Sequence, residues 1–149
     1  MDIFKDLYQQ LIIDHNQNPQ NYYSMLNATH VAEGHNPLCG DQMKVFLRIN
    51  KDVIEEISFQ GNGCAISKAS ASIMTTVLAS IKITDAQEIF KIFHKIITSG
   101  NIDNKKYNID KLEVLGGVYK YPSRVKCASL AWHTFQGALK KTIELIKTE

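Results

Sequence analysis

The feature that most constrains this chain is the stretch G-H-N-P-L-C-G-D-Q, residues 34–42. Its glycines, asparagine and proline favour turns, so the backbone around Cys39 is not expected to be helical. Side chains two positions apart in an extended or turning backbone point the same way, so Cys39 and Asp41 can reach one common atom. A soft thiolate beside a hard carboxylate is a suitable half-site for a borderline metal such as zinc. A small buried cysteine beside an ordinary turn is the alternative interpretation.

The other two cysteines, Cys64 and Cys127, lie far from Cys39 in the sequence. The chain has no C-x-x-C pair, and three cysteines without an export signal argue against a disulfide framework. Three thiolates and Asp41 would supply the four ligands of a tetrahedral zinc site. The hard oxygen of Asp41 would then be the ligand that is most easily replaced. Spacing alone leaves a metal site and simple core packing open.

Length and composition predict one domain over residues 1–149 with its own hydrophobic core. A hydrophobic fraction of 44% and a charged fraction of 21% are typical of soluble globular proteins. The formal net charge of +2 is too small to indicate nucleic-acid binding. The N-terminus does not resemble a signal peptide and no apolar run reaches membrane-spanning length, so we expect a cytoplasmic protein with no membrane partner.

Hydrophobic periodicity predicts an α+β fold, a small antiparallel sheet with helices packed against it. We expect helices over residues 2–16, 65–80, 84–99, 110–115 and 124–147, with residues 84–87 as a capping box. Strands are expected over 29–33, 42–49 and 53–60, and a change of period in the last strand allows a bulge.

These elements place two cysteines at helix starts. Cys64 precedes the helix at 65–80, and Cys127 falls in the first turn of the last helix, which Ser123 could cap. A helix N-terminus favours a thiolate through its dipole and free N–H groups. Lys126 cannot bind metal as an ammonium, because it has no free lone pair.

Three segments of the chain resemble the signature blocks of one protein family. They are G-H-N-P-L-C-G-D (34–41), G-N-G-C-A-I-S-K-A-S-A-S (61–72) and R-V-K-C-A-S-L-A-W (124–132), and the opening L-Y-Q-Q-L-I-I-D-H-N-Q-N-P-Q-N (7–21) is similar as well. The family is that of the IscU/SufU iron–sulfur cluster assembly U proteins. Lys126 stands where Isc-type scaffolds have a histidine, and residues 81–117 are longer than in those scaffolds. Both departures resemble the SufU branch.

That resemblance implies a single domain with a fold similar to SufE and NifU. It implies an enzyme, a zinc-dependent sulfurtransferase that accepts persulfide sulfur from a SufS-type cysteine desulfurase and serves downstream cluster assembly proteins. Cys39 would be the catalytic sulfur acceptor, and Arg124 and Lys126 would support the site or the docking of the partner. The implied zinc ligands are Cys39, Asp41, Cys64 and Cys127. The alternatives are a scaffold for a transient iron–sulfur cluster and a small zinc-stabilised interaction module.

Overall fold

The computed structural model describes residues 3–102, 106–140 and 146–147. The helices are α1 (Ile3–Gln17), α2 (Ala65–Leu78), α3 (Ile83–Ser99), the 3₁₀ helix η1 (Asp110–Lys120) and α4 (Pro122–Leu139). The strands are β1 (His30–Asn36), β2 (Asp41–Asn50), β3 (Val53–Asn62), β4 (Ile81–Lys82) and β5 (Ile146–Lys147). This content confirms the predicted α+β fold.

The sheet has the order β4-β3-β2-β1-β5. The three expected strands, β1 to β3, pair antiparallel as predicted. The short β4, which was not predicted, pairs antiparallel with β3, and β5 runs parallel to β1 beside Gly34 and His35. The predicted bulge is present where β2 pairs with β3. Arg48 lies opposite Glu56 and Ile49 lies opposite Ile54, so β3 carries one extra residue there.

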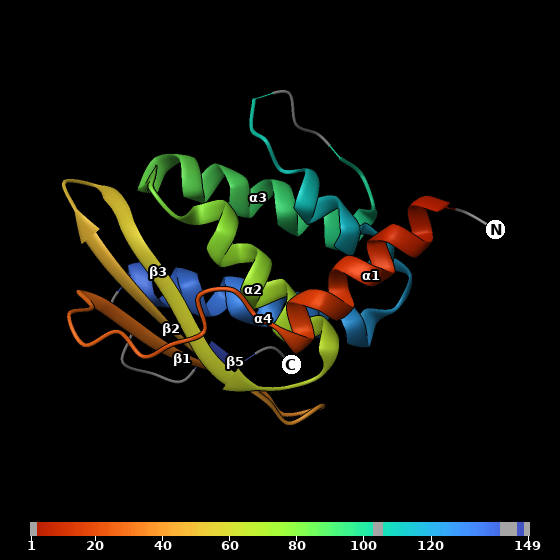
Figure 1. The fold of residues 1–149 in the computed structure, drawn as a ribbon, viewed down its shortest axis with the longest axis horizontal. Helices are drawn as coiled ribbons and strands as arrows, with labels where there is room; N and C mark the ends of the chain where they lie inside the picture. The colour runs from red at the N-terminus through yellow and green to blue at the C-terminus, as the bar shows by residue number, and fades with distance from the viewer. Residues whose placement is uncertain (1–2, 103–105, 141–145, 148–149) are drawn as a thin grey trace.

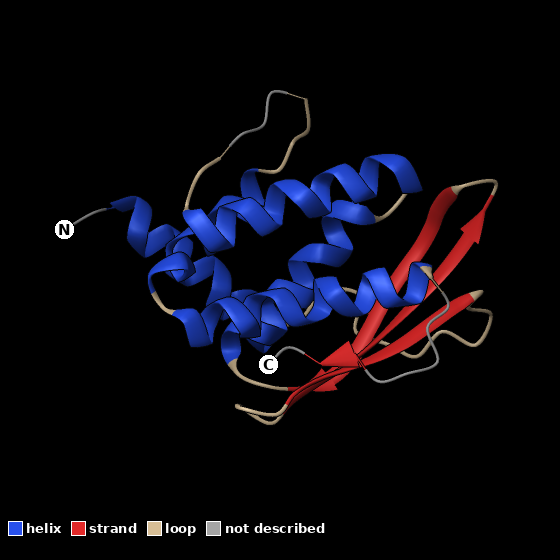
Figure 2. Cartoon of the chain, turned by 180° about the vertical axis from the view of Figure 1, so that it is seen from behind, coloured by secondary structure: helices blue, strands red, loops and turns tan. Residues whose placement is uncertain are grey.

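The helices gather on one side of the sheet, with α2 and α4 next to the strands (Figures 1 and 2). Met43, Val45 and Leu47 alternate along β2 and are buried on that side. The rings of Phe93 on α3 and Trp132 on α4 stack with centroids 4.3 Å apart, which joins the outer helix to the inner one. No helix in the described residues is long and apolar enough to cross a membrane.

Several predicted boundaries are wrong, and the last helix differs most. It begins at Pro122 rather than near Arg124, because proline suits the first helical position, where its missing N–H has no partner to lose. It ends at Leu139, and residues 146–147 form β5 instead of helix. Gly116 and Gly117 do not stop the preceding helix, which continues to Lys120.

The predicted capping box at the start of α3 is also wrong. The helix begins at Ile83, so Thr84 lies inside its first turn, and Lys82 occupies the cap position without a side-chain hydrogen bond. The loop after α1 is anchored by two of the three residues that its sequence suggests, Tyr22 and Tyr23. The hydroxyl of Tyr22 donates to the carbonyl of Gly61 and its ring packs edge-on against Phe59, and the hydroxyl of Tyr23 donates to Glu56. Met25 is buried, whereas Leu26 is fully exposed. The predicted cap at Asp2 lies outside the described residues.

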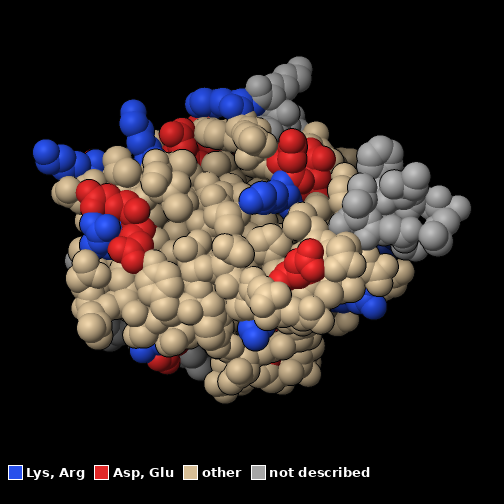
Figure 3. Space-filling model, in the orientation of Figure 1, with Lys and Arg blue, Asp and Glu red and all other residues tan. Residues whose placement is uncertain are grey.

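Charged side chains on the face shown in Figure 3 lie in small groups of mixed sign, separated by wide uncharged areas.

Candidate metal centre

Cys39 lies in the short connection between β1 and β2. The backbone carbonyl of Asn36 accepts hydrogen bonds from the N–H groups of Cys39 (3.3 Å) and Gly40 (2.9 Å), and this closes the turn. Gly40 has a φ of 72°, a left-handed conformation that glycine adopts without strain. The turn leaves Cys39 exposed.

The fold brings three of the predicted site residues together. The sulfur of Cys127 lies 3.6 Å from the sulfur of Cys39, and ligand atoms of Cys39, Asp41 and Cys127 all lie within 4.8 Å of one another. Two thiolates on a tetrahedral zinc, each at about 2.3 Å, would be about 3.8 Å apart. Two thiols and a carboxylate at this spacing fit zinc, so the three residues form a candidate metal site.

Asp41 is the first residue of β2 and is fully buried. Its Oδ1 accepts a hydrogen bond from the backbone N–H of Cys64 at 2.9 Å, and its Oδ2 accepts one from the hydroxyl of Ser67 at 2.6 Å. A buried carboxylate needs such partners, because burial without them would strongly disfavour its charge. The carboxylate therefore ties β2 to the start of α2.

Cys64 occupies the N-cap of α2, where the prediction placed it, and its sulfur accepts a hydrogen bond from the N–H of Ser67 at 3.5 Å. The residue is exposed. Its sulfur does not belong to the group whose ligand atoms all lie within 4.8 Å of one another. It still lies close enough to affect Cys127, as the pKa of that thiol shows. Cys64 is therefore adjacent to the three grouped residues, and its role as a ligand stays a prediction.

Cys127 is buried on α4. Burial raises the pKa of this thiol strongly, and the neighbouring groups of Cys64, Cys39 and Asp41 raise it further. A bound cation would reverse this effect by stabilising the thiolate. Cys127 is the sixth residue of α4 and not part of its first turn, because the helix begins at Pro122. The argument from the helix N-terminus thus applies to Cys64 alone.

The two basic residues assigned to site support lie on the same helix. Arg124 is exposed, and its guanidinium lies 4.6 Å from the centre of the Tyr121 ring. Lys126 is half-buried, and its backbone carbonyl accepts a hydrogen bond from Ser129. These observations place both residues near the helix end that carries Cys127, and their functional role stays a prediction.

Sequence reasoning missed two polar residues that hold the site. The side chain of Asn36, fully buried, donates to the sulfur of Cys127 (3.8 Å) and accepts from the N–H of Leu38 (3.3 Å). The hydroxyl of Ser67 donates a hydrogen bond to Asp41. A signal for Ser67 was present, because the third residue of a helix faces back toward its N-cap.

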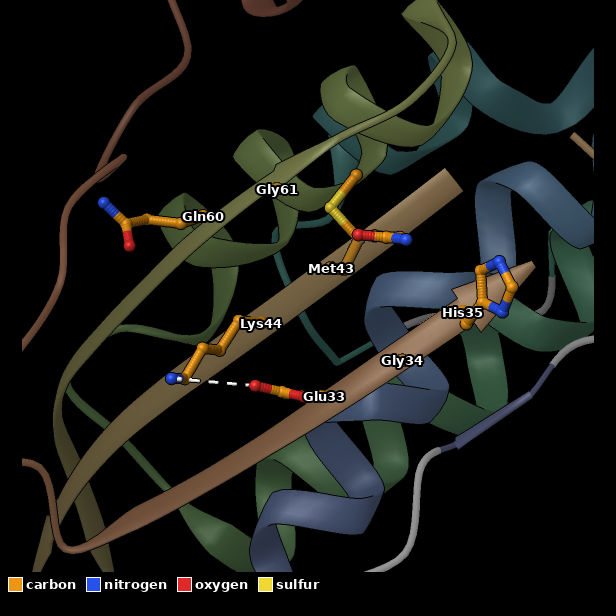
Figure 4. Close-up of a pocket in the computed structure, with 8 residues that line it drawn as sticks. Glu33, Gly34, His35, Met43, Lys44, Gln60 and Gly61 are labelled. Atoms are coloured by element: carbon orange, nitrogen blue, oxygen red, sulfur yellow. Dashed lines mark ion pairs between the residues drawn. The ribbon is translucent and has the colours of Figure 1, made fainter. Parts of the chain in front are cut away.

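A pocket of about 360 Å³ lies nearby, on the sheet face that points away from the helices. Figure 4 shows Lys44 of β2 directed toward Glu33 of β1, an ion pair of 3.7 Å, with Gln60 of β3 beyond them. Asp41 of the cluster is buried on the opposite side of the same strand. The pocket and the cysteine cluster are therefore separate features on two faces of the sheet.

Comparisons with known proteins agree on a family. The model of the NifU-like N terminal domain matches residues 7–140. The zinc-dependent sulfurtransferase SufU of Bacillus subtilis is 37% identical over 135 residues, which cover 91% of this chain and 90% of that protein. The iron–sulfur cluster assembly scaffold protein IscU of Streptococcus pyogenes is 33% identical, covering 91% and 84%.

A solved structure of a nitrogen-fixing NifU-like protein from Brucella abortus, its N-terminal part, has the same fold. It superimposes with a TM-score of 0.81 at 17% identity and covers 94% of this chain and 96% of that one. The sequence blocks, the cysteine cluster and these similarities lead to one conclusion: the chain belongs to the NifU-like N-terminal domain family and is a U-type iron–sulfur cluster assembly protein.

Proposed function

We propose that this protein is a zinc-dependent sulfurtransferase that accepts persulfide sulfur on Cys39 from a cysteine desulfurase. The observation that carries the proposal is the contrast within one cluster. Cys39 is exposed at a turn, whereas its neighbour Cys127, 3.6 Å away, is buried. A partner's active site can reach the first thiol without unfolding this domain. The similarity to the SufU sulfurtransferase supports the same reading.

Zinc, when bound, would hold the thiols of Cys39, Cys64 and Cys127 as thiolates, with Asp41 as the fourth ligand. The Cys39 turn would then move outward to meet the partner, which requires the bond of Cys39 to zinc, its contact with the sulfur of Cys127 and the hydrogen bonds of the turn to Asn36 to yield. The thiolate of Cys39 attacks the outer sulfur of the desulfurase persulfide. Its electron pair forms the new S–S bond, and the pair of the old S–S bond leaves with the desulfurase cysteine as a thiolate. Arg124 and Lys126 offset the negative charge of the cluster during docking.

The test is alanine production from cysteine by the partner desulfurase, with and without this protein. The wild type should stimulate turnover, and Cys39→Ala should not, with circular dichroism showing that the variant is folded. Mass spectrometry under non-reducing conditions should find one added sulfur on Cys39. Stimulation by Cys39→Ala equal to that of the wild type, or added sulfur on Cys127 alone, would refute the proposal.

A scaffold that holds a transient iron–sulfur cluster is the second candidate. The grouped thiols of Cys39 and Cys127 suit iron–sulfur clusters as well as zinc, and the similarity to the S. pyogenes scaffold is nearly as high. Lys126, in place of the histidine of Isc-type scaffolds, favours the sulfurtransferase. Metal analysis of anaerobically purified protein separates the two, since the scaffold would carry iron and sulfide. In either role the downstream partners would be cluster assembly proteins of the cytoplasm.

A further inference from the structure

Ser67 is a buried serine in the first turn of α2, and its hydroxyl lies between two of the candidate ligands. The oxygen is 2.6 Å from Oδ2 of Asp41 and 3.5 Å from the sulfur of Cys64. A hydroxyl has one proton to donate, and the short contact with the carboxylate identifies Asp41 as the acceptor. The sulfur of Cys64 is engaged instead by the backbone N–H of Ser67.

Asp41 has little freedom to turn. The N–H of Cys64 holds Oδ1, the hydroxyl of Ser67 holds Oδ2, and the side chain is fully buried. Gly63 also lies close to this carboxylate, since a Cβ added there would lie only 2.7 Å from Oδ1. Each oxygen thus keeps one donor from the protein and has one lone pair left for a cation.

We propose that Ser67 is a positioning residue of the metal centre, which acts by fixing the carboxylate of Asp41. The inference rests on the proposed function in one respect, that the cluster binds zinc. It adds that Ser67 and the N–H of Cys64 hold the carboxylate of Asp41 in place. Burial and two donors anchor Asp41, whereas Cys39 sits on an exposed turn. The carboxylate is therefore held more firmly than its hardness as a ligand alone would suggest.

The consequence for Ser67→Ala follows from the geometry. Loss of the hydroxyl frees Oδ2, so the carboxylate can rotate or present both oxygens to a cation. Removal of such outer partners typically weakens metal binding about 10- to 100-fold. Ser72 offers a matched control, because it is fully buried on the same helix and its hydroxyl bonds the ring of His15 at 2.7 Å and the N–H of Gln20 at 2.8 Å, away from the cluster.

The experiment uses the full chain loaded with Co²⁺, whose visible absorption reports the number and type of ligands. Ser67→Ala should shift the visible bands and speed metal loss to a chelator about 10- to 100-fold, and Ser67→Thr, which keeps a hydroxyl, should restore both toward wild type. Ser72→Ala should lower the unfolding midpoint and leave the spectrum and the rate of metal loss unchanged.

Two outcomes would overturn the inference. One is a Ser67→Ala spectrum and metal-loss rate identical to those of the wild type. The other is that the wild type binds neither Co²⁺ nor Zn²⁺. Denaturation of the metal-free variants shows whether each is folded, so a spectral change from misfolding is recognised and counts against the inference. If Ser67 behaves as expected while the wild type fails to stimulate a desulfurase, the sulfurtransferase proposal fails and the inference about Ser67 stands.

Discussion

The sulfurs of Cys39 and Cys127 lie 3.6 Å apart, yet the first residue is exposed and the second is buried. The two thiols are therefore in contact with each other, but solvent reaches only the side chain of Cys39. Burial raises the pKa of Cys127 and thus lowers its thiolate fraction at neutral pH in the metal-free protein. One cluster thus contains an accessible thiol and a protected one.

The first prediction concerns the order in which the metal-free thiols react. After chelation, iodoacetamide at pH 7.5 should modify Cys39 and Cys64 at least about tenfold faster than Cys127, because each pKa unit lowers the thiolate fraction about tenfold and Cys127 is also shielded. Peptide mass spectrometry over a time course measures the three rates. In denaturant the rates should converge, and equal rates in the folded protein would contradict the assigned burial.

Gly34 carries the second prediction, because its role differs from the one expected. The sequence suggested a turn, but Gly34 lies inside β1, where an added Cβ would come within 2.0 Å of the Thr134 hydroxyl and 3.1 Å of Leu130. Gly34→Ala should push α4, which carries Cys127, away from the sheet and destabilise the protein by about 1–3 kcal/mol.

Gly117→Ala is the control for that change. A Cβ at Gly117 meets nothing within 4 Å, so the free energy of unfolding should stay within about 0.5 kcal/mol of wild type. Urea denaturation of both variants provides the comparison. Equal stability of the two would mean that α4 does not pack this closely on β1.

The third prediction concerns pH. Burial lowers the pKa of His15 below its ordinary value, Lys111 lowers it further, and Asp14 opposes the shift weakly. Below the ordinary pKa of about 6.5 the unfolded chain binds a proton that the folded protein resists, so stability is lost as pH falls through that value and toward the folded pKa.

The variant that tests this is His15→Asn, whose amide can still bond the hydroxyl of Ser72, 2.7 Å from His15 Nδ1. The loss of stability between about pH 7 and 5 should be smaller in the variant, by at most about 1.4 kcal/mol per pH unit. Denaturation of both metal-free proteins at each pH measures the difference. Parallel stability curves for the two proteins would show that His15 does not contribute.

The sequence predicted the local structure correctly where neighbouring residues alone determine the backbone conformation. The Gly40 turn, the Cys64 cap and the β2 alternation follow from short-range rules, and the structure confirms all three. The start of α4 was harder to predict, because Pro122 suits the first helical position and Ser123 suits the N-cap, and the two choices place the helix start at different residues.

The sequence indicated which residue types could bind a metal, but it did not indicate how close to one another the fold would bring them. Nothing in the spacing of Cys39 and Cys127 states that α4 crosses β1 at Gly34, the contact that brings the two thiols together. Asn36 and Ser67 were missed because their bonding partners are distant in sequence, across 91 residues for Asn36 and 26 for Ser67. Buried polar residues of this kind are recognised only once their acceptors are known.

The last prediction separates the two roles open to Cys64. The sulfur of Cys64 caps α2. Cys64 lies next to Cys39, Asp41 and Cys127, but its sulfur is not among the ligand atoms that all lie within 4.8 Å of one another. Cys64→Ser preserves the cap, since serine is among the best N-cap residues, but removes the thiolate. The metal-free variant should therefore match the wild type in stability to within about 1 kcal/mol. If Cys64 is the fourth ligand, zinc affinity measured by competition with a chromophoric chelator should fall more than about 100-fold, beyond what loss of an outer partner causes. Unchanged affinity would leave Cys64 as a helix cap alone and a centre with three ligands from this chain, whose fourth position is then open to a ligand supplied by a partner.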